Sequence, residues 1–396
     1  MSDILDLRRR TFFEGKRRAV VAAGMTGAAP AAFAEEAKAL PDYVAWKDAA
    51  AMIVHSDKTL ETRRGAIGTG SITPADRLYI RNNVNVPDAS IVKDRDAWSL
   101  EVGGVRQPRA ITVGELKTLG VATVASVLQC SGNGRAFSDH KPSGTQWTVG
   151  AAGCVLWTGV PLKTVVEAMG GAVDGVKFVT GTGGEEIPAG LDPKDLIVER
   201  SVPVEILDTI VLAWARNGEP LPLAHGGPLR MVVPGFAGVN NVKYVKKIAL
   251  TEVESDAKIQ ATRYRLYPVG GKATPQDPSV WAMEVKSWIT SPLETAKPGR
   301  LQNTGVALGG VNALAGVEVS TDGGKTWLKA ELLGPDLGRH AWRPFALGVD
   351  LAAGKHTLVS RATDNESKVQ PENFPPNQSG YSNNGWRVHG VTVDIA

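Results

Sequence analysis

The sequence predicts an α+β domain over residues 76–255, followed by an all-β domain over residues 256–396. Three observations predict this organisation. In the first region, apolar β-rich runs alternate with helical ones and with irregular loops. In the second, short strands follow one another between turns without helical periodicity, which is typical of a β-sandwich. A length of 396 residues also suits two domains better than one.

Residues 1–34 predict an export signal that precedes the fold. A twin-arginine pattern begins at Arg9, an uncharged Ala/Gly-rich stretch covers residues 19–33, and Ala-Phe-Ala at residues 32–34 is a cleavage pattern. The apolar stretch is too short for a stable membrane span, and the alternative is a disordered basic arm. We therefore expect a periplasmic protein whose mature chain starts at Glu35. Twin-arginine export suits a protein that folds around a complex cofactor before it crosses the membrane.

This signal accounts for the positive charge of the chain. The formal net charge is +3, and residues 1–34 carry six basic and three acidic side chains, so the mature chain is close to neutral. A nucleic-acid-binding function therefore has no electrostatic support. Residues 35–75 are mixed and polar, and we expect them to form an N-terminal arm over the first domain.

Local patterns define four elements of the first domain. Residues 124–129 are an apolar, β-branched run and predict a buried strand. Pro161 suits the start of a short helix over residues 161–169, and the two glycines that follow suit its end. Residues 176–180 and 230–233 predict further strands.

The second domain is predicted from its turns. Residues 317–320 and 327–332 flank the Gly-rich turn 321–325 and predict a hairpin. Further short strands are expected over residues 345–349, 355–362 and 388–395.

The two cysteines of the chain have different settings. Cys154 stands between a glycine and an apolar run and is expected to be a small buried hydrophobe. A disulfide with Cys130 is the alternative in an oxidising compartment. There is no Cys-x-x-Cys-His motif, so we expect no covalently attached c-type haem.

Cys130 follows the strand predicted at residues 124–129 and enters a loop of small residues. Serine and glycines at residues 131–134 leave room for a bulky group close to the backbone, and Arg135 adds a fixed positive charge. A thiolate at a strand end beside an arginine suits a transition-metal ligand next to an anion site. The alternative is a buried free cysteine before an ordinary turn.

Five segments, in the same order and with similar spacing, resemble the molybdopterin-dependent sulfite oxidase family. Residues 128–133, Leu-Gln-Cys-Ser-Gly-Asn, resemble its molybdenum-ligand loop, and residues 79–87 resemble its Arg-Asn-rich active-site segment. The remaining segments are similar to two following blocks and to the cofactor-anchoring loop of the family, over residues 146–153, 157–162 and 225–235. The resemblance is nearest to bacterial periplasmic sulfite dehydrogenases without haem.

This resemblance implies a molybdenum-pyranopterin cofactor, with Cys130 as the protein ligand of the metal. It implies a sulfite-oxidase-type molybdopterin domain followed by an immunoglobulin-like domain that dimerises. The cofactor-binding residues that it implies are Asn82, Asn83, Cys130, His225, Arg230 and Lys243.

The same resemblance implies how the substrate is held. Arg81 and Arg135 match the arginines that bind the substrate anion, and Trp147 matches the aromatic residue that walls the substrate pocket. Tyr264 matches a tyrosine that donates a hydrogen bond near the metal, with Tyr267 as the alternative assignment.

The implied function is a sulfite dehydrogenase that oxidises sulfite to sulfate and passes electrons singly to an external c-type cytochrome. The alternatives are a dehydrogenase of a carrier-bound sulfane sulfur, a methionine sulfoxide reductase of the same superfamily, and a binding protein that has lost its cofactor. Two positions depart from the vertebrate pattern: Asn83 stands in place of a histidine, and Ser379 in place of a further substrate arginine. These departures affect the expected substrate affinity rather than the type of reaction.

Overall fold

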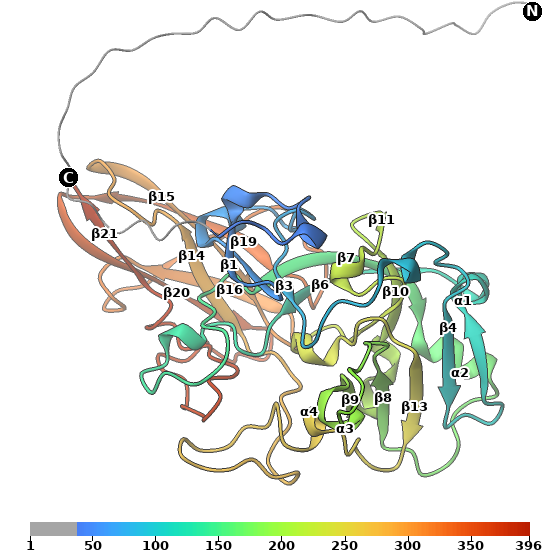
Figure 1. Ribbon diagram of the computed structural model, residues 1–396. Coiled ribbons are helices and arrows are strands. Elements are labelled where there is room, and N and C mark those ends of the chain that lie inside the picture. Colours follow the sequence, from blue (N-terminus) through green and yellow to red (C-terminus); the bar gives the residue numbers. More distant parts are fainter. Residues whose placement is uncertain (1–37) are drawn as a thin grey trace, which may run out of the picture. The chain divides into compact units, whose positions relative to one another are not determined.

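The strands of the protein form five sheets within residues 38–396, which are the residues that the computed structural model describes (Figure 1). The export signal predicted at residues 1–34 lies outside the described residues. The first sheet contains β1 (Met52–Ser56), β2 (Thr59–Thr62) and β3 (Ile80–Arg81). Because β2 and β3 are antiparallel neighbours, residues that we assigned to an arm share a sheet with Arg81.

Two five-stranded sheets build the first domain. One has the order β11-β10-β7-β6, with β12 paired to β10, and the other has the order β5-β4-β13-β8-β9. The pairs within them are antiparallel, except that β13 runs parallel to β4. The strands are β4 (Ser99–Gly103), β5 (Arg109–Thr112), β6 (Ala122–Gln129), β7 (Ala152–Pro161), β8 (Phe178–Thr182), β9 (Glu199–Pro203), β10 (Val211–Arg216), β11 (Glu219–Pro220), β12 (Arg230–Val232) and β13 (Lys247–Thr251).

The α-helices of the described residues are short. They are α1 (Val113–Leu119), α2 (Leu162–Ala168), α3 (Pro193–Leu196) and α4 (Lys258–Ala261). The helix predicted over residues 161–169 is therefore confirmed as α2, which ends before two glycines with φ of 81° and 85°. Both α1 and α2 bury apolar residues such as Leu116 and Val165 in the core that the two sheets share.

The C-terminal region consists of two four-stranded sheets, with the orders β14-β15-β19-β18 and β17-β16-β20-β21. Apolar residues from both sheets, among them Ile289, Phe345 and Leu358, form one core. The predicted hairpin is confirmed in part: Leu328–Lys329 pair with β16, whereas Glu331–Leu332, which were predicted to continue the same strand, pair with β19 of the other sheet. The strands are β14 (Lys286–Ser291), β15 (Gly299–Leu308), β16 (Leu314–Ser320), β17 (Leu328–Lys329), β18 (Glu331–Leu332), β19 (Arg343–Leu351), β20 (Gly354–Asp364) and β21 (Val391–Ile395).

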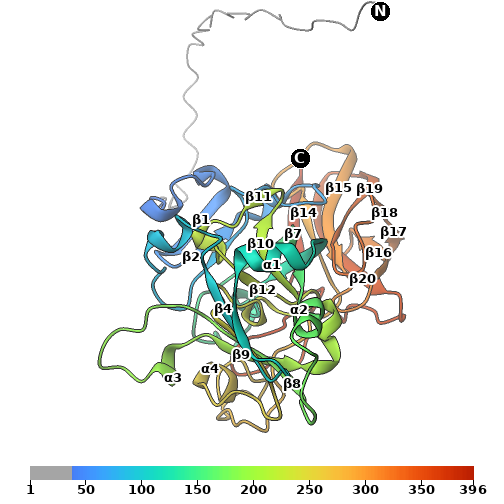
Figure 2. The ribbon, with the colours of Figure 1, turned by 90° about the vertical axis from the view of Figure 1, so that its right-hand side faces the viewer.

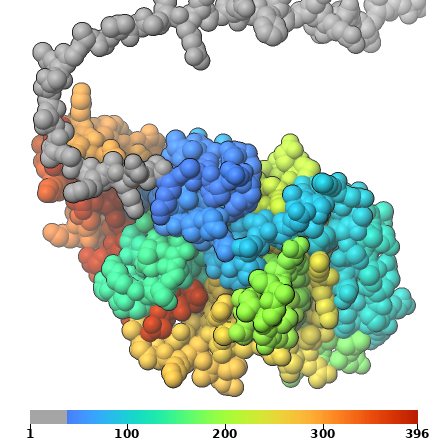
Figure 3. Space-filling model, in the orientation of Figure 1, coloured from blue at the N-terminus to red at the C-terminus, as the bar shows by residue number. Residues whose placement is uncertain are grey.

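The two regions are joined by a common core. Val127 of β6 packs in one cluster with Trp288 and Trp342 from the C-terminal region, and its N–H donates to the His340 carbonyl at 2.8 Å. Figure 2 shows the C-terminal strands (orange to red) beside β7 and β10. The N-terminal segment (blue in Figure 3) lies between these strands and the first domain, and Arg64 donates to the Ile289 carbonyl of β14 at 2.6 Å. Among residues 38–396, no helix is long and apolar enough to cross a membrane.

Candidate functional site

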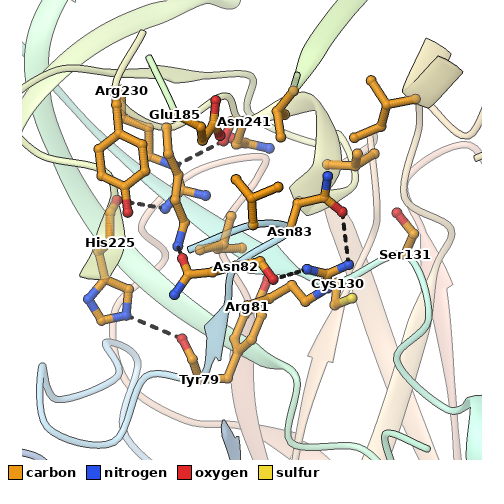
Figure 4. A pocket seen from close by; sticks show the side chains of 18 of the residues that line it. Tyr79, Arg81, Asn82, Asn83, Cys130, Ser131, Glu185, His225, Arg230 and Asn241 are labelled. Atoms are coloured by element: carbon orange, nitrogen blue, oxygen red, sulfur yellow. Dashed lines mark hydrogen bonds between the residues drawn. The ribbon is translucent and has the colours of Figure 1, made fainter. Parts of the chain in front are cut away.

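One pocket gathers most of the residues that the sequence analysis selected. It encloses about 740 Å³ of space, which includes open solvent at its mouth, and lies where β3, β6 and β12 approach one another (Figure 4). The predicted residues that line it are Arg81, Asn82, Asn83, Cys130, His225, Arg230, Lys243 and Tyr264. Segments that are far apart in the sequence therefore converge on one cavity.

Cys130 follows directly after β6, and its backbone is held on both sides. Its N–H donates to the Ala151 carbonyl at 2.9 Å, and its carbonyl accepts from the Asn133 N–H at 2.9 Å. A Cβ at Gly132 would lie 2.5 Å from Nη2 of Arg135, so a larger residue here would displace the Arg135 guanidinium. The loop presents a buried, unpaired thiol to the pocket.

Arg81 carries a positive charge to the same end of the pocket (Figure 4). Its guanidinium donates to the Asn82 carbonyl and, at 3.4 Å, to Oδ1 of Asn83. Burial opposes its charge, but the neighbouring Tyr264 and Cys130 outweigh burial and raise the pKa of Arg81. A permanently charged, fork-shaped donor beside a thiol suits the binding of a small oxyanion.

The other end of the pocket holds His225, Arg230 and Lys243. Nη1 of Arg230 donates to the His225 carbonyl at 3.0 Å, and Nζ of Lys243 donates to Oδ1 of Asn82 at 2.6 Å. Nε2 of His225 lies 3.2 Å from the Tyr79 carbonyl, whereas its buried Nδ1 has no partner among the residues described. These side chains converge although β12 separates His225 from Lys243 in the sequence.

The positive charge at this end exceeds what the surrounding acids balance. Burial, followed by the charge of Arg230, holds the pKa of Lys243 well below its ordinary value. Burial, followed by Arg216 and Lys47, does the same to the pKa of His225. Glu185 is the acidic residue that lines the pocket, and burial raises its pKa to about 7.

A phosphate ester fits this cationic end. It would relieve the repulsion between the buried charges and would give acceptors to donors that are otherwise unpaired. The Cys130 end fits a metal that takes its other ligands from the cofactor, because the protein offers one soft sulfur ligand there. The pocket therefore matches a group with a metal at one end and a phosphate at the other.

Arg135 does not line the pocket, which differs from the direct substrate contact that we expected. It is buried, and it donates from Nε to the Ser379 carbonyl at 2.8 Å and from Nη1 to the Thr145 carbonyl at 2.9 Å. Its guanidinium also lies 5.3 Å from the centre of the Tyr381 ring. These two carbonyls and the Tyr381 ring therefore hold the Arg135 guanidinium outside the lining of the pocket.

Trp147 is likewise absent from the pocket wall. It is 1% exposed and packs edge-on against Tyr79, with ring centres 6.2 Å apart, and against His55, at 5.1 Å. Tyr79 itself lines the pocket. Trp147 therefore supports the wall through its contact with Tyr79.

The structure distinguishes the two candidate tyrosines. Tyr264 lines the pocket and Tyr267 does not. Tyr264 has a φ of 49°, which is unusual for a bulky residue and is a form of strain that occurs at functional sites. Its ring stacks on Tyr381, with centres 5.0 Å apart and an interplanar angle of 11°.

Several pocket residues were not selected from the sequence: Tyr79, Ser131, Glu185, Asn241 and Tyr244. Tyr79 and Ser131 lie within the segments that resemble the sulfite oxidase family, next to residues that were predicted to form the site. That position in the sequence could have identified them. Glu185 had none, because a pair of acidic residues after a Gly-rich run is common on surfaces. Tyr381, behind Tyr264, also had no motif to mark it.

Known protein families match both regions of the chain. An oxidoreductase molybdopterin binding domain matches residues 84–259, and a Mo-co oxidoreductase dimerisation domain matches residues 277–395. The fold and the pocket thus define a molybdenum oxidoreductase that binds a molybdopterin cofactor. The chain belongs to the molybdopterin-dependent sulfite oxidase family.

Individual relatives agree with this assignment. The chain is 28% identical to the sulfite oxidase of Arabidopsis thaliana, over 82% of this chain and 89% of that protein. It is 32% identical to human mitochondrial sulfite oxidase, over 80% of this chain and 61% of that protein. It is also 32% identical to the NAD(P)H nitrate reductase of Hordeum vulgare, over 80% of this chain and 39% of that protein.

A solved structure shares the fold. The sulfane dehydrogenase SoxCD from Paracoccus pantotrophus superposes with a TM-score of 0.72 at 26% sequence identity, over 87% of this chain and 88% of that one. The chain thus spans nearly all of SoxCD and of the plant sulfite oxidase, but well under half of the barley nitrate reductase.

Proposed function

We propose that this chain is a periplasmic sulfite dehydrogenase that oxidises sulfite to sulfate and passes electrons singly to an external c-type cytochrome. The observation that carries the proposal is a pocket in which Arg81 lies beside Cys130, with Arg230 and Lys243 at the opposite end. The bound molybdenum cofactor supplies the redox chemistry. In the overall reaction, sulfite gains one oxygen that derives from water and releases two electrons and two protons.

The residues of the chain would attract and orient the substrate. Arg81 remains charged at any physiological pH, and its guanidinium can donate to two oxygens of an anion. The Tyr264 hydroxyl can donate a hydrogen bond without adding charge. Arg135 would act through the stack that it forms with Tyr381 and Tyr264, and Trp147 through Tyr79. Asn82 would orient the Nζ of Lys243 toward the phosphate.

The location and assembly are also proposals. The twin-arginine pattern that begins at Arg9 supports periplasmic export. The C-terminal sheets would form an immunoglobulin-like sandwich through which two copies dimerise. Their strand orders support this, since they correspond to the ABED and CFG sheets of immunoglobulin domains with β17 added beside β16. The dimerisation-domain match over residues 277–395 supports the same assembly.

A second candidate substrate is a sulfane sulfur held on a carrier. The likeness to SoxCD, a sulfane dehydrogenase, favours it. The same fold and cofactor would serve, and the difference would lie in what reaches the Arg81 end of the pocket. Sulfite is small enough to enter the pocket alone, whereas a carrier-bound sulfur also needs a docking surface for the carrier.

A substrate comparison tests these alternatives. Purified holoenzyme is expected to reduce ferricyanide or cytochrome c with sulfite, and to show little turnover with thiosulfate, nitrate or methionine sulfoxide. It should show no haem absorbance and should behave as a dimer in light scattering. Turnover with a sulfane-sulfur carrier but not with sulfite would replace the first candidate with the second. Stoichiometric oxygen uptake with release of hydrogen peroxide would make the protein an oxidase instead.

Replacing Arg135 with glutamine tests whether this charge serves the substrate. We expect kcat/KM for sulfite to fall at least tenfold, equivalent to about 1.4 kcal/mol, because the pocket loses a nearby cation. The melting temperature should also fall, since the Ser379 and Thr145 carbonyls lose their donor. Arg109→Gln, at an exposed ion pair with Glu115, is the matched control. Unchanged kinetics with a lower melting temperature would show that Arg135 is structural only.

A further inference from the structure

The loop that presents Cys130 is held from the C-terminal region. Three of its backbone carbonyls accept hydrogen bonds from residues of β14 or of the loop before β21. The pairs are Ser382 N–H to Ser131 O at 2.9 Å, Lys286 Nζ to Asn133 O at 3.1 Å, and Asn383 Nδ2 to Gly134 O at 3.0 Å. The region matched as a dimerisation domain therefore also contacts the backbone next to the thiol.

Lys286 is the unusual member of this group. It is the first residue of β14 and is only 2% exposed, and the Asn133 carbonyl is its single hydrogen-bond acceptor among the described residues. Its ammonium also lies 5.6 Å from the centre of the Trp288 ring. Burying a charged lysine without a carboxylate partner costs stability, and an apolar side chain would fill the same space at lower cost. The position of Lys286 therefore needs an explanation other than packing.

The surroundings of Lys286 are polar but offer it no salt bridge. It lines a small second pocket, whose wall includes Ser131, a residue that also lines the main pocket. Burial, followed by the charge of Arg64, lowers the pKa of Lys286 to about 7. Burial, followed by the charge of Lys286, holds the pKa of His389 well below its ordinary value. Glu284 lines the second pocket, but its carboxylate contacts Lys368 instead.

Asn133 connects Lys286 to the thiol. The Asn133 N–H donates to the Cys130 carbonyl at 2.9 Å, and its Oδ1 accepts from the Ala151 N–H at 3.1 Å. Since the Cys130 N–H also donates to the Ala151 carbonyl, the turn is fixed from both ends. The Asn133 carbonyl takes no part in these bonds and accepts from the ammonium of Lys286 at 3.1 Å.

We propose that Lys286 is a positioning residue for the metal-ligand loop. By binding the Asn133 carbonyl, assisted by Asn383 at Gly134, it holds the turn in the orientation that directs the Cys130 thiolate at the molybdenum. The C-terminal region would then contribute to the geometry of the metal site as well as to assembly. The proposal rests on Cys130 as the ligand of the metal and does not depend on which substrate is oxidised.

The test compares Lys286→Met with Lys286→Arg in the holoenzyme. Methionine keeps the length and loses the donor, whereas arginine retains donors. We expect Lys286→Met to fold and bind molybdenum, with an altered molybdenum electron paramagnetic resonance spectrum and kcat lowered about tenfold or more at nearly unchanged KM, as is typical when a residue that orients a ligand is lost. Lys286→Arg should restore most of the spectrum. Lys329→Met, on the exposed strand β17, is the matched control.

A second variant keeps the proposal testable if Lys286→Met does not fold. Asn383→Ala removes the neighbouring bond to Gly134 and should change the spectrum in the same direction by a smaller amount. The proposal is overturned if the folded variants keep the wild-type spectrum and kcat. The spectrum reports the geometry of the metal site whichever substrate the enzyme oxidises. An unchanged spectrum would therefore overturn this proposal alone, whereas a lack of turnover with sulfite would overturn only the proposed function.

Discussion

Replacing Cys130 with serine is expected to abolish turnover while the chain still folds. Serine keeps the size of the side chain and the backbone bonds of the turn, so the Ala151 and Asn133 contacts can form unchanged. A hydroxyl is a harder and poorer ligand for molybdenum than a thiolate, and it does not ionise at neutral pH. The measurements are steady-state turnover with sulfite, molybdenum content and far-ultraviolet circular dichroism. Wild-type turnover in this variant would show that Cys130 is not the ligand.

Cys154→Ser is the matched control, since it makes the same change in the other cysteine. Cys154 is fully buried opposite Val127, and burial raises the pKa of its thiol to about 12, so it remains protonated. We expect this variant to retain molybdenum and turnover. It should lose about 1–3 kcal/mol of stability, because a hydroxyl replaces a thiol in an apolar core. Both cysteines are unpaired in the structure, as we expected.

The parts of the fold that depend on local pattern could be predicted from the sequence. The strand before Cys130, helix α2 and the β16–β17 hairpin each follow from a run of residues and its flanking turn. The pairing of β2 with β3 could not be predicted, because β2 has four residues, β3 has only two, and a long loop separates them in the sequence. Non-local pairing of this kind leaves no local signal.

The residues of the candidate site also divide into those that a local motif identifies and those whose position depends on distant parts of the chain. Cys130, Arg81 and His225 lie in motifs, and the pocket brings them together. The orientation of Arg135 could not be predicted, because it depends on a carbonyl of Ser379, 244 residues away. Lys286 was missed for the same reason, since nothing in its strand indicates that its ammonium reaches the Cys130 loop.

The cationic end of the pocket has a further consequence for the protein without its cofactor. Burial, followed by the charge of Arg230, lowers the pKa of Lys243, and burial, followed by other nearby cations, lowers the pKa of His225, so added positive charge is unfavourable here when no anion is bound. A bound phosphate would therefore gain from balancing this charge as well as from its own hydrogen bonds. Cofactor retention should accordingly be sensitive to any one of these charges.

Replacing Arg230 with methionine is expected to leave a folded chain that has lost its cofactor. Methionine keeps the apolar length of the side chain but removes the charge and the donors. A charge-assisted hydrogen bond contributes about 1.5–3 kcal/mol, and a loss of about 3 kcal/mol lowers affinity roughly a hundredfold. We expect molybdenum and phosphate contents far below those of the wild type, measured by metal and phosphate analysis of the purified protein. Arg300→Met, at an exposed ion pair with Asp350, should retain both. A full molybdenum content in Arg230→Met would show that the cofactor is held without Arg230 and that this end of the pocket does not depend on its charge.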